Sequence, residues 1–323
     1  MALFASSKLA LKRGALITAA NWQVVVLQWV ADSVFTALLA VPVVGGSALV
    51  VLTSGLSPRD LVSQDLRRAV LTVAAALLAH PMALAAFLAA MFVVVLGGSL
   101  LMAFVKGGTI AVLATADAEA GPIEHPPLRL DLVDRAGRFR LEAATAGAQR
   151  LFGRFARLGI GLFLAYGLIT TAALASLVAS GTPQSAADAV WLFAVTVAGI
   201  VAVTLVNLLY LLLQIAVAVD DCGARASLAR VSAFLLRRPR DIAIVFGVVL
   251  TLVALGTAAS FLATTALGLI AFVPFVGLAA LPLQVGAWMM RGLVFQFLGL
   301  TALVAYLRLY RLSGGGGGGG GTA

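Results

Sequence analysis

Six long stretches of the chain are apolar from end to end, and each is long enough to cross a lipid bilayer as a helix. A hydrocarbon core about 30 Å thick needs about 20 helical residues to span it. Backbone polar groups find no water in lipid, so a stretch of this length must be helical. The stretches are Trp22–Val43, Met82–Val105, Leu158–Ala179, Val190–Val219, Ile242–Ile270 and Gln284–Leu307. We therefore expect an all-α, polytopic helical membrane protein with about six transmembrane helices.

The composition fits a chain that is surrounded by lipid over most of its length. Apolar residues make up 62% of the 323 residues, and charged residues only 11%. An ordinary soluble protein has about 45–50% apolar and about 25% charged residues. We expect one integral membrane domain over residues 1–312, in which the first apolar stretch is a retained span rather than a cleaved signal peptide. Residues 313–323 contain a run of glycines and are expected to form a flexible tail.

The segment Ser57–Ala79 allows two interpretations, because its apolar part is too short to cross a bilayer. Charged residues precede that part, and Pro81 separates it from the span that follows. One interpretation is a helix that lies in the outer interface or dips into it. The other is one long, kinked span that starts near Ala69.

Lysine and arginine residues lie almost entirely on one side of the predicted spans. Of the 22 in the chain, only Arg59, Arg67 and Arg68 fall in loops on the other side, and Arg291 falls inside a span. The largest basic loop covers residues 106–157. Because cytoplasmic loops of helical membrane proteins carry the excess of lysine and arginine, we expect both termini in the cytoplasm.

The polar part of that loop, residues 117–148, allows two local structures. Leu128–Leu132 and Phe139–Glu142 alternate apolar and charged residues, which is typical of a small β-hairpin. The alternative is a loop that leads into a basic helix. At about 30 residues, the segment is too short for an independent catalytic domain.

A basic segment precedes each odd-numbered span. In the middle one, Arg150, Arg154 and Arg157 share one helical face, with apolar residues on the other. Ser7–Leu16 and Ala224–Arg238 are looser versions. These segments either act only as positive-inside anchors, or they form a repeat in which a basic interfacial helix precedes each of three helix hairpins. We expect their arginines to contact anionic headgroups on the cytoplasmic side. The candidate lipid-contacting residues are Arg150, Arg154, Arg157, Arg230, Arg237 and Arg238.

No motif in the chain predicts a catalytic, cofactor-binding or metal-binding residue. The sequence has no Cys/His cluster with metal-ligand spacing, no phosphate-binding loop and no serine nucleophile elbow. Asp220–Arg225 partly resembles the core motif of the CDP-alcohol phosphotransferases, but Ala226–Pro239 lacks the further carboxylates that such a metal site needs. We instead expect Asp220 and Asp221 to cap the basic helix that follows. The chain is therefore not expected to be an enzyme.

Two charged side chains, Asp32 and Arg291, lie inside predicted spans at depths where they could meet. A charge within a membrane is costly and is usually paired or directed toward a cavity. The pair is interpreted as a structural clamp between the first and last spans; the alternative is a relay or ligand site. Polar residues on one face of the fourth span, Asn207, Tyr210 and Gln214, are expected to form hydrogen bonds between helices.

The layout of the chain resembles the six-span membrane domain attached to some bacterial glycerophosphoryl diester phosphodiesterases, and related bacterial membrane families. The resemblance rests on Val219–Asp221 followed by Ser227–Pro239, and on Leu11–Gly14 with Asn21-Trp22 before the first span. It implies a helical fold in a bacterial inner membrane. The hydrolase domain of those proteins is not among residues 1–323, so no catalytic residue is carried over.

The function expected from the sequence is that of a non-enzymatic, integral inner-membrane module. Such a module would act through contacts with membrane lipids, including anionic headgroups, or with a protein partner, and we expect no nucleic-acid partner. The alternative is a small transporter or permease with a polar site between the helix hairpins. In a transporter, interrupted helices usually meet near the middle of the membrane.

Overall fold

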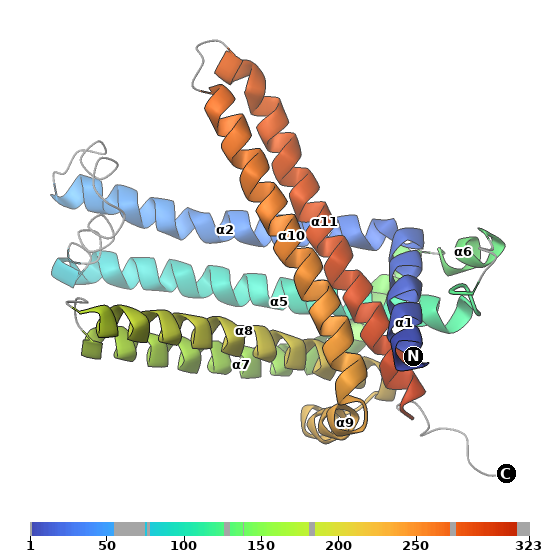
Figure 1. The fold of residues 1–323 in the computed structure, drawn as a ribbon. Coiled ribbons are helices and arrows are strands. Elements are labelled where there is room, and N and C mark those ends of the chain that lie inside the picture. Colours follow the sequence, from blue (N-terminus) through green and yellow to red (C-terminus); the bar gives the residue numbers. More distant parts are fainter. Residues whose placement is uncertain are drawn as a thin grey trace. The chain divides into compact units, whose positions relative to one another are not determined.

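The computed structural model describes residues 2–54, 75, 78–125, 130–137, 139–180, 185–271 and 276–314. Helices make up nearly all of these residues, and no strand occurs among them. The all-α fold class is therefore confirmed (Figure 1). The helices are α1 (Ala2–Ala20), α2 (Trp22–Ser54), α5 (Pro81–Glu119), α6 (Leu130–Ala136), α7 (Leu141–Ser180), α8 (Ala186–Asp220), α9 (Ala224–Arg237), α10 (Pro239–Ala271) and α11 (Val276–Leu312).

Within the described residues, six helices are long and apolar enough to cross a membrane. They are α2, α5, α7, α8, α10 and α11, and each contains one of the stretches expected from the sequence. The chain is thus a multi-pass integral membrane protein. The helices are longer than a crossing requires: α7 has 40 residues, which at 1.5 Å per residue is about 60 Å, or about twice the hydrocarbon thickness.

The chain forms two compact units, residues 30–102 and residues 1–29 with 103–323. The smaller unit consists of the adjoining parts of α2 and α5. Two glycines let aromatic rings lie directly against the helix backbone there: Phe35 of α2 covers Gly98, and Phe87 of α5 covers Gly46. A side chain at either glycine would collide with the ring, so these small residues permit the close packing of the two helices.

The larger unit contains two antiparallel helix hairpins, α7 with α8 and α10 with α11, whose helices lie side by side in Figure 1. The short helices pack around them: α1 against α10 and α11, α6 against α1, and α9 against α8 and α10. Helices α1 and α11 approach each other closely, because a side chain at Gly14 would collide with the carbonyl of Thr301. Ser185 starts α8 through a capping box. The Ser185 hydroxyl accepts from the backbone N–H of Asp188, and the Asp188 carboxylate accepts from the backbone N–H of Ser185.

Buried residues of the larger unit are concentrated at one end of its long helices. The two cores draw on α1, α9, the last part of α5, the first part of α7, the last part of α8, the start of α10 and the last part of α11. The rest of α7, α8 and α10 exposes large apolar side chains such as Phe163, Phe193 and Phe261. Exposed apolar surface of this extent is typical of a membrane-facing region, whereas the packed residues lie toward one end of these helices. We call the packed part the charged end.

The structure differs from the sequence predictions at the charged end. Helix α5 continues to Glu119, past the predicted end of the span at Val105, and the segment predicted as the loop 106–157 is largely helical. The basic segment with Arg150, Arg154 and Arg157 is the first part of α7 and not a separate helix, because no proline separates it from the span. The β-hairpin alternative for residues 117–148 is wrong, since Leu130–Ala136 forms a helix.

Parts of two predictions fall outside the described residues. The alternatives for 57–79 concern a segment of which only residues 75, 78 and 79 are described, and nearly all of the predicted tail lies beyond residue 314. Within the larger unit, α1 and α9 precede α2 and α10 as the predicted repeat requires. A separate helix therefore precedes the span for the first and third basic segments, whereas the middle one is continuous with its span. That these helices lie in the interface stays a prediction.

Candidate functional site

A buried cluster of charges joins α1, the end of α5 and the end of α11. Arg13 is 2% exposed, and its guanidinium donates from Nε to Asp117 Oδ1 at 2.5 Å and from Nη1 to Glu124 Oε2 at 2.6 Å. Arg311 pairs with the other oxygen of Asp117 at 2.6 Å, and Arg308 pairs with Glu124 at 3.5 Å. Each carboxylate is thus shared between two arginines, so the cluster stabilises the contact of three chain segments.

The surroundings of Glu124 in this cluster lower its pKa. Burial by itself would raise the pKa of Glu124. The hydrogen bond from its own backbone N–H and the hydrogen bond and charge of Arg13 outweigh that effect, so the pKa of Glu124 lies below its ordinary value. The cluster is therefore a set of paired charges rather than a proton relay.

A second set of ion pairs surrounds the connection between α8 and α9. Asp220 accepts a hydrogen bond from the Tyr310 hydroxyl at 2.5 Å and pairs with Arg230 at 2.8 Å. Asp221 has a left-handed backbone with φ 50° and ends α8. Its carboxylate accepts from both Nη atoms of Arg154, at 2.5 and 3.2 Å.

The predicted role of Asp220 and Asp221 as caps of the following helix is wrong. The N-cap of α9 is Gly223, and no side chain caps it. Both carboxylates instead accept hydrogen bonds from residues distant in the sequence. Two of the predicted lipid-contacting arginines, Arg154 and Arg230, are therefore already engaged in ion pairs.

The arginines at the end of α9 interact with the start of α10 and with the end of α11. Arg238 pairs with Asp241 at 3.5 Å, and Asp241 also accepts from the Ser7 hydroxyl of α1 at 3.0 Å. The guanidiniums of Arg237 and Arg238 donate to the carbonyls of Ser313 and Leu312, at 3.5 and 3.4 Å. A cation at the C-terminal end of a helix is stabilised by the free carbonyls there. These two arginines therefore stabilise the C-terminal end of α11.

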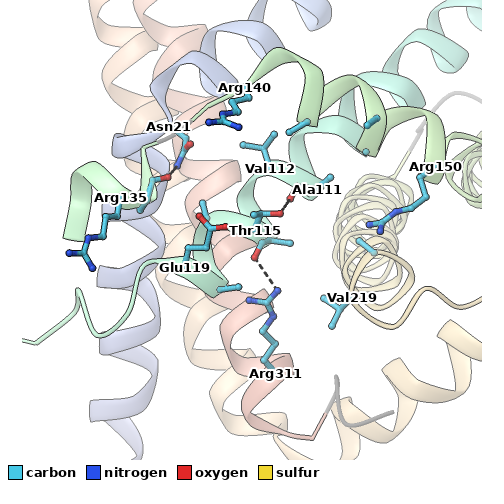
Figure 2. Close-up of a pocket in the computed structure, with 18 residues that line it drawn as sticks. Asn21, Ala111, Val112, Thr115, Glu119, Arg135, Arg140, Arg150, Val219 and Arg311 are labelled. Atoms are coloured by element: carbon cyan, nitrogen blue, oxygen red, sulfur yellow. Dashed lines mark hydrogen bonds between the residues drawn. The ribbon is translucent and has the colours of Figure 1, made fainter. Parts of the chain in front are cut away.

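A cavity of about 560 Å³ opens at the charged end, between α5, α6, α7, α8, α11 and Asn21, the residue that joins α1 to α2. Figure 2 shows the side chains around it. Alanine is the commonest residue in its wall, and its charged lining residues are Glu119, Arg135, Arg140, Arg150 and Arg311. Of these arginines, only Arg311 has a salt bridge among the described residues.

Asn21 contributes a buried polar group to the cavity wall. Its side chain is 1% exposed, and its amide nitrogen donates to the carbonyls of Ile17 and Ala136 at 2.9 and 2.8 Å. Its amide oxygen has no hydrogen-bond partner. The cavity wall therefore combines arginines with a buried acceptor that has no partner.

The intramembrane charges fall in different units. Asp32 is exposed and belongs to residues 30–102, whereas Arg291 belongs to the larger unit and lies 5.6 Å from the ring centre of Phe295. Their pairing stays a prediction. The expected hydrogen bond between helices is confirmed for Asn207, whose amide oxygen accepts from the Tyr166 hydroxyl of α7 at 2.5 Å. No cluster of three or more metal-ligating side chains occurs in the part of the chain that the structure describes.

Sequence reasoning missed the charge cluster and the cavity. It treated Arg13, Arg308 and Arg311 only as positive-inside residues. A signal was present, because Asp117 and Glu124 closely follow an apolar helix on the basic side of the membrane. Acidic residues there have arginines within reach, but the sequence does not show which of them meet.

Comparisons of the chain with family models, with curated proteins and with solved structures gave no match. The resemblance to the membrane domain associated with glycerophosphoryl diester phosphodiesterases therefore stays a prediction.

Proposed function

We propose that this integral membrane protein is a non-enzymatic module whose charged end binds anionic lipid headgroups at the cytoplasmic face of a bacterial inner membrane. The observation that carries the proposal is the position of unpaired arginines beside exposed apolar helix surface. Exposed arginines of the charged end without a salt bridge among the described residues are Arg135, Arg140, Arg150, Arg157, Arg225, Arg237 and Arg240.

The charge balance of this end favours anionic partners. The buried carboxylates Asp117, Glu124 and Asp241 are already paired with arginines, so they do not neutralise the exposed arginines. A basic residue near an anionic membrane surface contributes about 1 kcal/mol of attraction. Guanidiniums also match the geometry of phosphate oxygens, which makes headgroup phosphates suitable acceptors.

The test compares lipid selection by the full chain and by a surface variant. In the variant, Arg157→Gln, Arg225→Gln and Arg240→Gln remove three exposed charges that lie outside the cavity lining. The matched control replaces the same residues by lysine, which keeps the charge. Each protein is extracted from vesicles of equal phosphatidylglycerol and phosphatidylcholine content, and the retained lipids are measured by mass spectrometry.

We expect the wild-type chain and the lysine variant to retain mainly phosphatidylglycerol, and the glutamine variant to lose much of that preference. The preference should weaken at high salt, because salt screens exposed charges. Equal retention of the two lipids by wild type, or an unchanged preference in the glutamine variant, would contradict the proposal.

A further inference from the structure

We propose that the cavity between α5, α6, α7, α8, α11 and Asn21 is a binding site for one phosphate ester that carries a hydroxyl group. This inference goes beyond general attraction to lipid, because it assigns a single built site with defined contacts. A free phosphate ester and a lipid headgroup share this chemistry, and the experiment below separates them.

The size and wall of the cavity suit a small ligand. Its volume of about 560 Å³ lies within the range of about 300–1,000 Å³ that is usual for ligand pockets. Alanines such as Ala143, Ala146 and Ala218 form much of the wall. Because these side chains are short, the polar groups around them can approach a ligand.

The charge of the cavity favours an anion. Its lining residues include four arginines, Arg135, Arg140, Arg150 and Arg311, but only one carboxylate, that of Glu119. Arg311 is held in place by Asp117 at 2.6 Å and by the Ala114 carbonyl at 3.1 Å. An arginine fixed by other contacts is oriented before a ligand arrives, which lowers the cost of binding.

The arginines that line the cavity differ in whether their guanidiniums point into it. Figure 2 shows Arg150 and Arg311 directed toward the cavity from different helices, whereas the guanidinium of Arg135 points away from it. Arg150 and Arg311 would therefore contact the ligand from different helices. Phosphate suits this arrangement, since its oxygens accept several charge-assisted hydrogen bonds at once.

The amide oxygen of Asn21 indicates the hydroxyl group of the ligand. Both contacts of its amide nitrogen are to backbone carbonyls, which fixes the orientation of the side chain. The oxygen is buried without a partner, and a buried acceptor left unpaired is costly. The phosphate group of a monoester carries a charge of about −1.5 to −2 at pH 7 and so has little donor capacity. A hydroxyl group elsewhere on the ligand would supply the donor, once a local shift uncovers this oxygen.

The experiment measures binding to the purified full chain in detergent by titration calorimetry. The two soluble probes are 2-hydroxyethyl phosphate and ethyl phosphate, which differ only by the hydroxyl group. We expect saturable binding of one molecule of 2-hydroxyethyl phosphate, and weaker binding of ethyl phosphate. In a second arm, short-chain phosphatidylglycerol and phosphatidylcholine are titrated into the same protein.

Two variants separate the cavity from the surface. Arg150 and Arg157 are both exposed arginines on one face of α7, but only Arg150 lines the cavity. Arg150→Gln should weaken binding of 2-hydroxyethyl phosphate about tenfold or more, as expected for loss of a charge-assisted hydrogen bond, whereas Arg157→Gln should bind this soluble probe as wild type does. Ala143→Phe, which fills the cavity without changing its charge, should also lose binding.

The results either show whether the ligand is a free phosphate ester or a lipid headgroup, or show that the cavity is not a binding site. Binding of the soluble ester supports a free phosphate ester, and saturable binding of phosphatidylglycerol alone, sensitive to Arg150→Gln, supports a headgroup. Absence of saturable binding in both arms would overturn the inference, as would equal loss in the Arg150→Gln and Arg157→Gln variants. Surface attraction alone predicts that equal loss, so the proposed function can hold while the cavity site fails.

Discussion

Arg13 is the residue on which the buried charge cluster depends. Its guanidinium touches both Asp117 and Glu124 and is almost fully buried. Removing one partner of a buried ion pair leaves an uncompensated charge and typically costs about 3–5 kcal/mol. We therefore expect Arg13→Gln to lower the melting temperature of the detergent-solubilised chain strongly. Lys8→Gln on the same helix is the control, because Lys8 is exposed. A melting temperature of Arg13→Gln equal to that of Lys8→Gln would refute this role.

The lowered pKa of Glu124 gives a second expectation at the same site. Its pKa lies below the ordinary value of 4.5. A carboxyl group with a lowered pKa in the folded state stabilises the protein above its unfolded pKa, and this contribution disappears as pH falls through the folded pKa. The difference in melting temperature between wild type and Glu124→Gln should be constant above about pH 4.5 and shrink at lower pH. Thermal scans across this range test it, and a difference independent of pH would contradict it.

The arginines show what a sequence can predict of such a site. Charge bias alone identified the basic end of the molecule, because that bias depends on local composition. It did not separate Arg154 and Arg230, which are paired with Asp221 and Asp220, from Arg157, which has no salt bridge among the described residues. Pairing depends on which helices meet, and periodicity within one helix carries no information on that.

At the scale of elements, the contact between α1 and α11 requires a glycine. A Cβ atom at Gly14 would collide with the backbone carbonyl of Thr301. Gly14→Ala should therefore push the helices apart and lower the melting temperature. Gly153→Ala is a matched control, since a Cβ there meets nothing within 4 Å and alanine favours a helix over glycine by about 1 kcal/mol. If both variants melted alike, the close contact would not contribute to stability.

The predicted clamp between Asp32 and Arg291 is also a property of elements, because it would join the first and last spans. If the two pair, Asp32→Asn and Arg291→Gln should each reduce the amount of folded protein, since each leaves a charge without its partner. The double variant should then recover part of the loss. Folded protein is measured by size-exclusion chromatography after detergent extraction. Additive losses would rule the clamp out.

The spans were predictable from sequence and the helix lengths were not. Apolar stretches follow from the thickness of the bilayer, so their number and places were correct. Lys106, Gly107 and Gly108 read as the end of the second span, yet α5 continues through them. The backbone of α7 packs closely against both glycines. They serve as a contact surface rather than a helix break, and only the tertiary structure reveals this.

At the scale of the whole molecule, the chain has two kinds of region: apolar helix segments suited to lipid, and a packed, charged end. Six helices present apolar residues over the length of a bilayer, while the buried cores and ion pairs lie at the ends of the helices. This division accounts for the composition of the chain, since a helix surrounded by lipid needs no charged surface. The arginines and the cavity belong to the packed, charged end.

The orientation of this end in the membrane is the central claim. In a Cys222→Ser background, single cysteines are placed at Arg225 in α9 and at Ala187 near the start of α8; both positions are exposed. Intact cells are then treated with a membrane-impermeant maleimide. We predict that the Ala187→Cys site reacts from outside and that the Arg225→Cys site reacts only after the cells are permeabilised. Reaction of the Arg225→Cys site in intact cells would contradict the account.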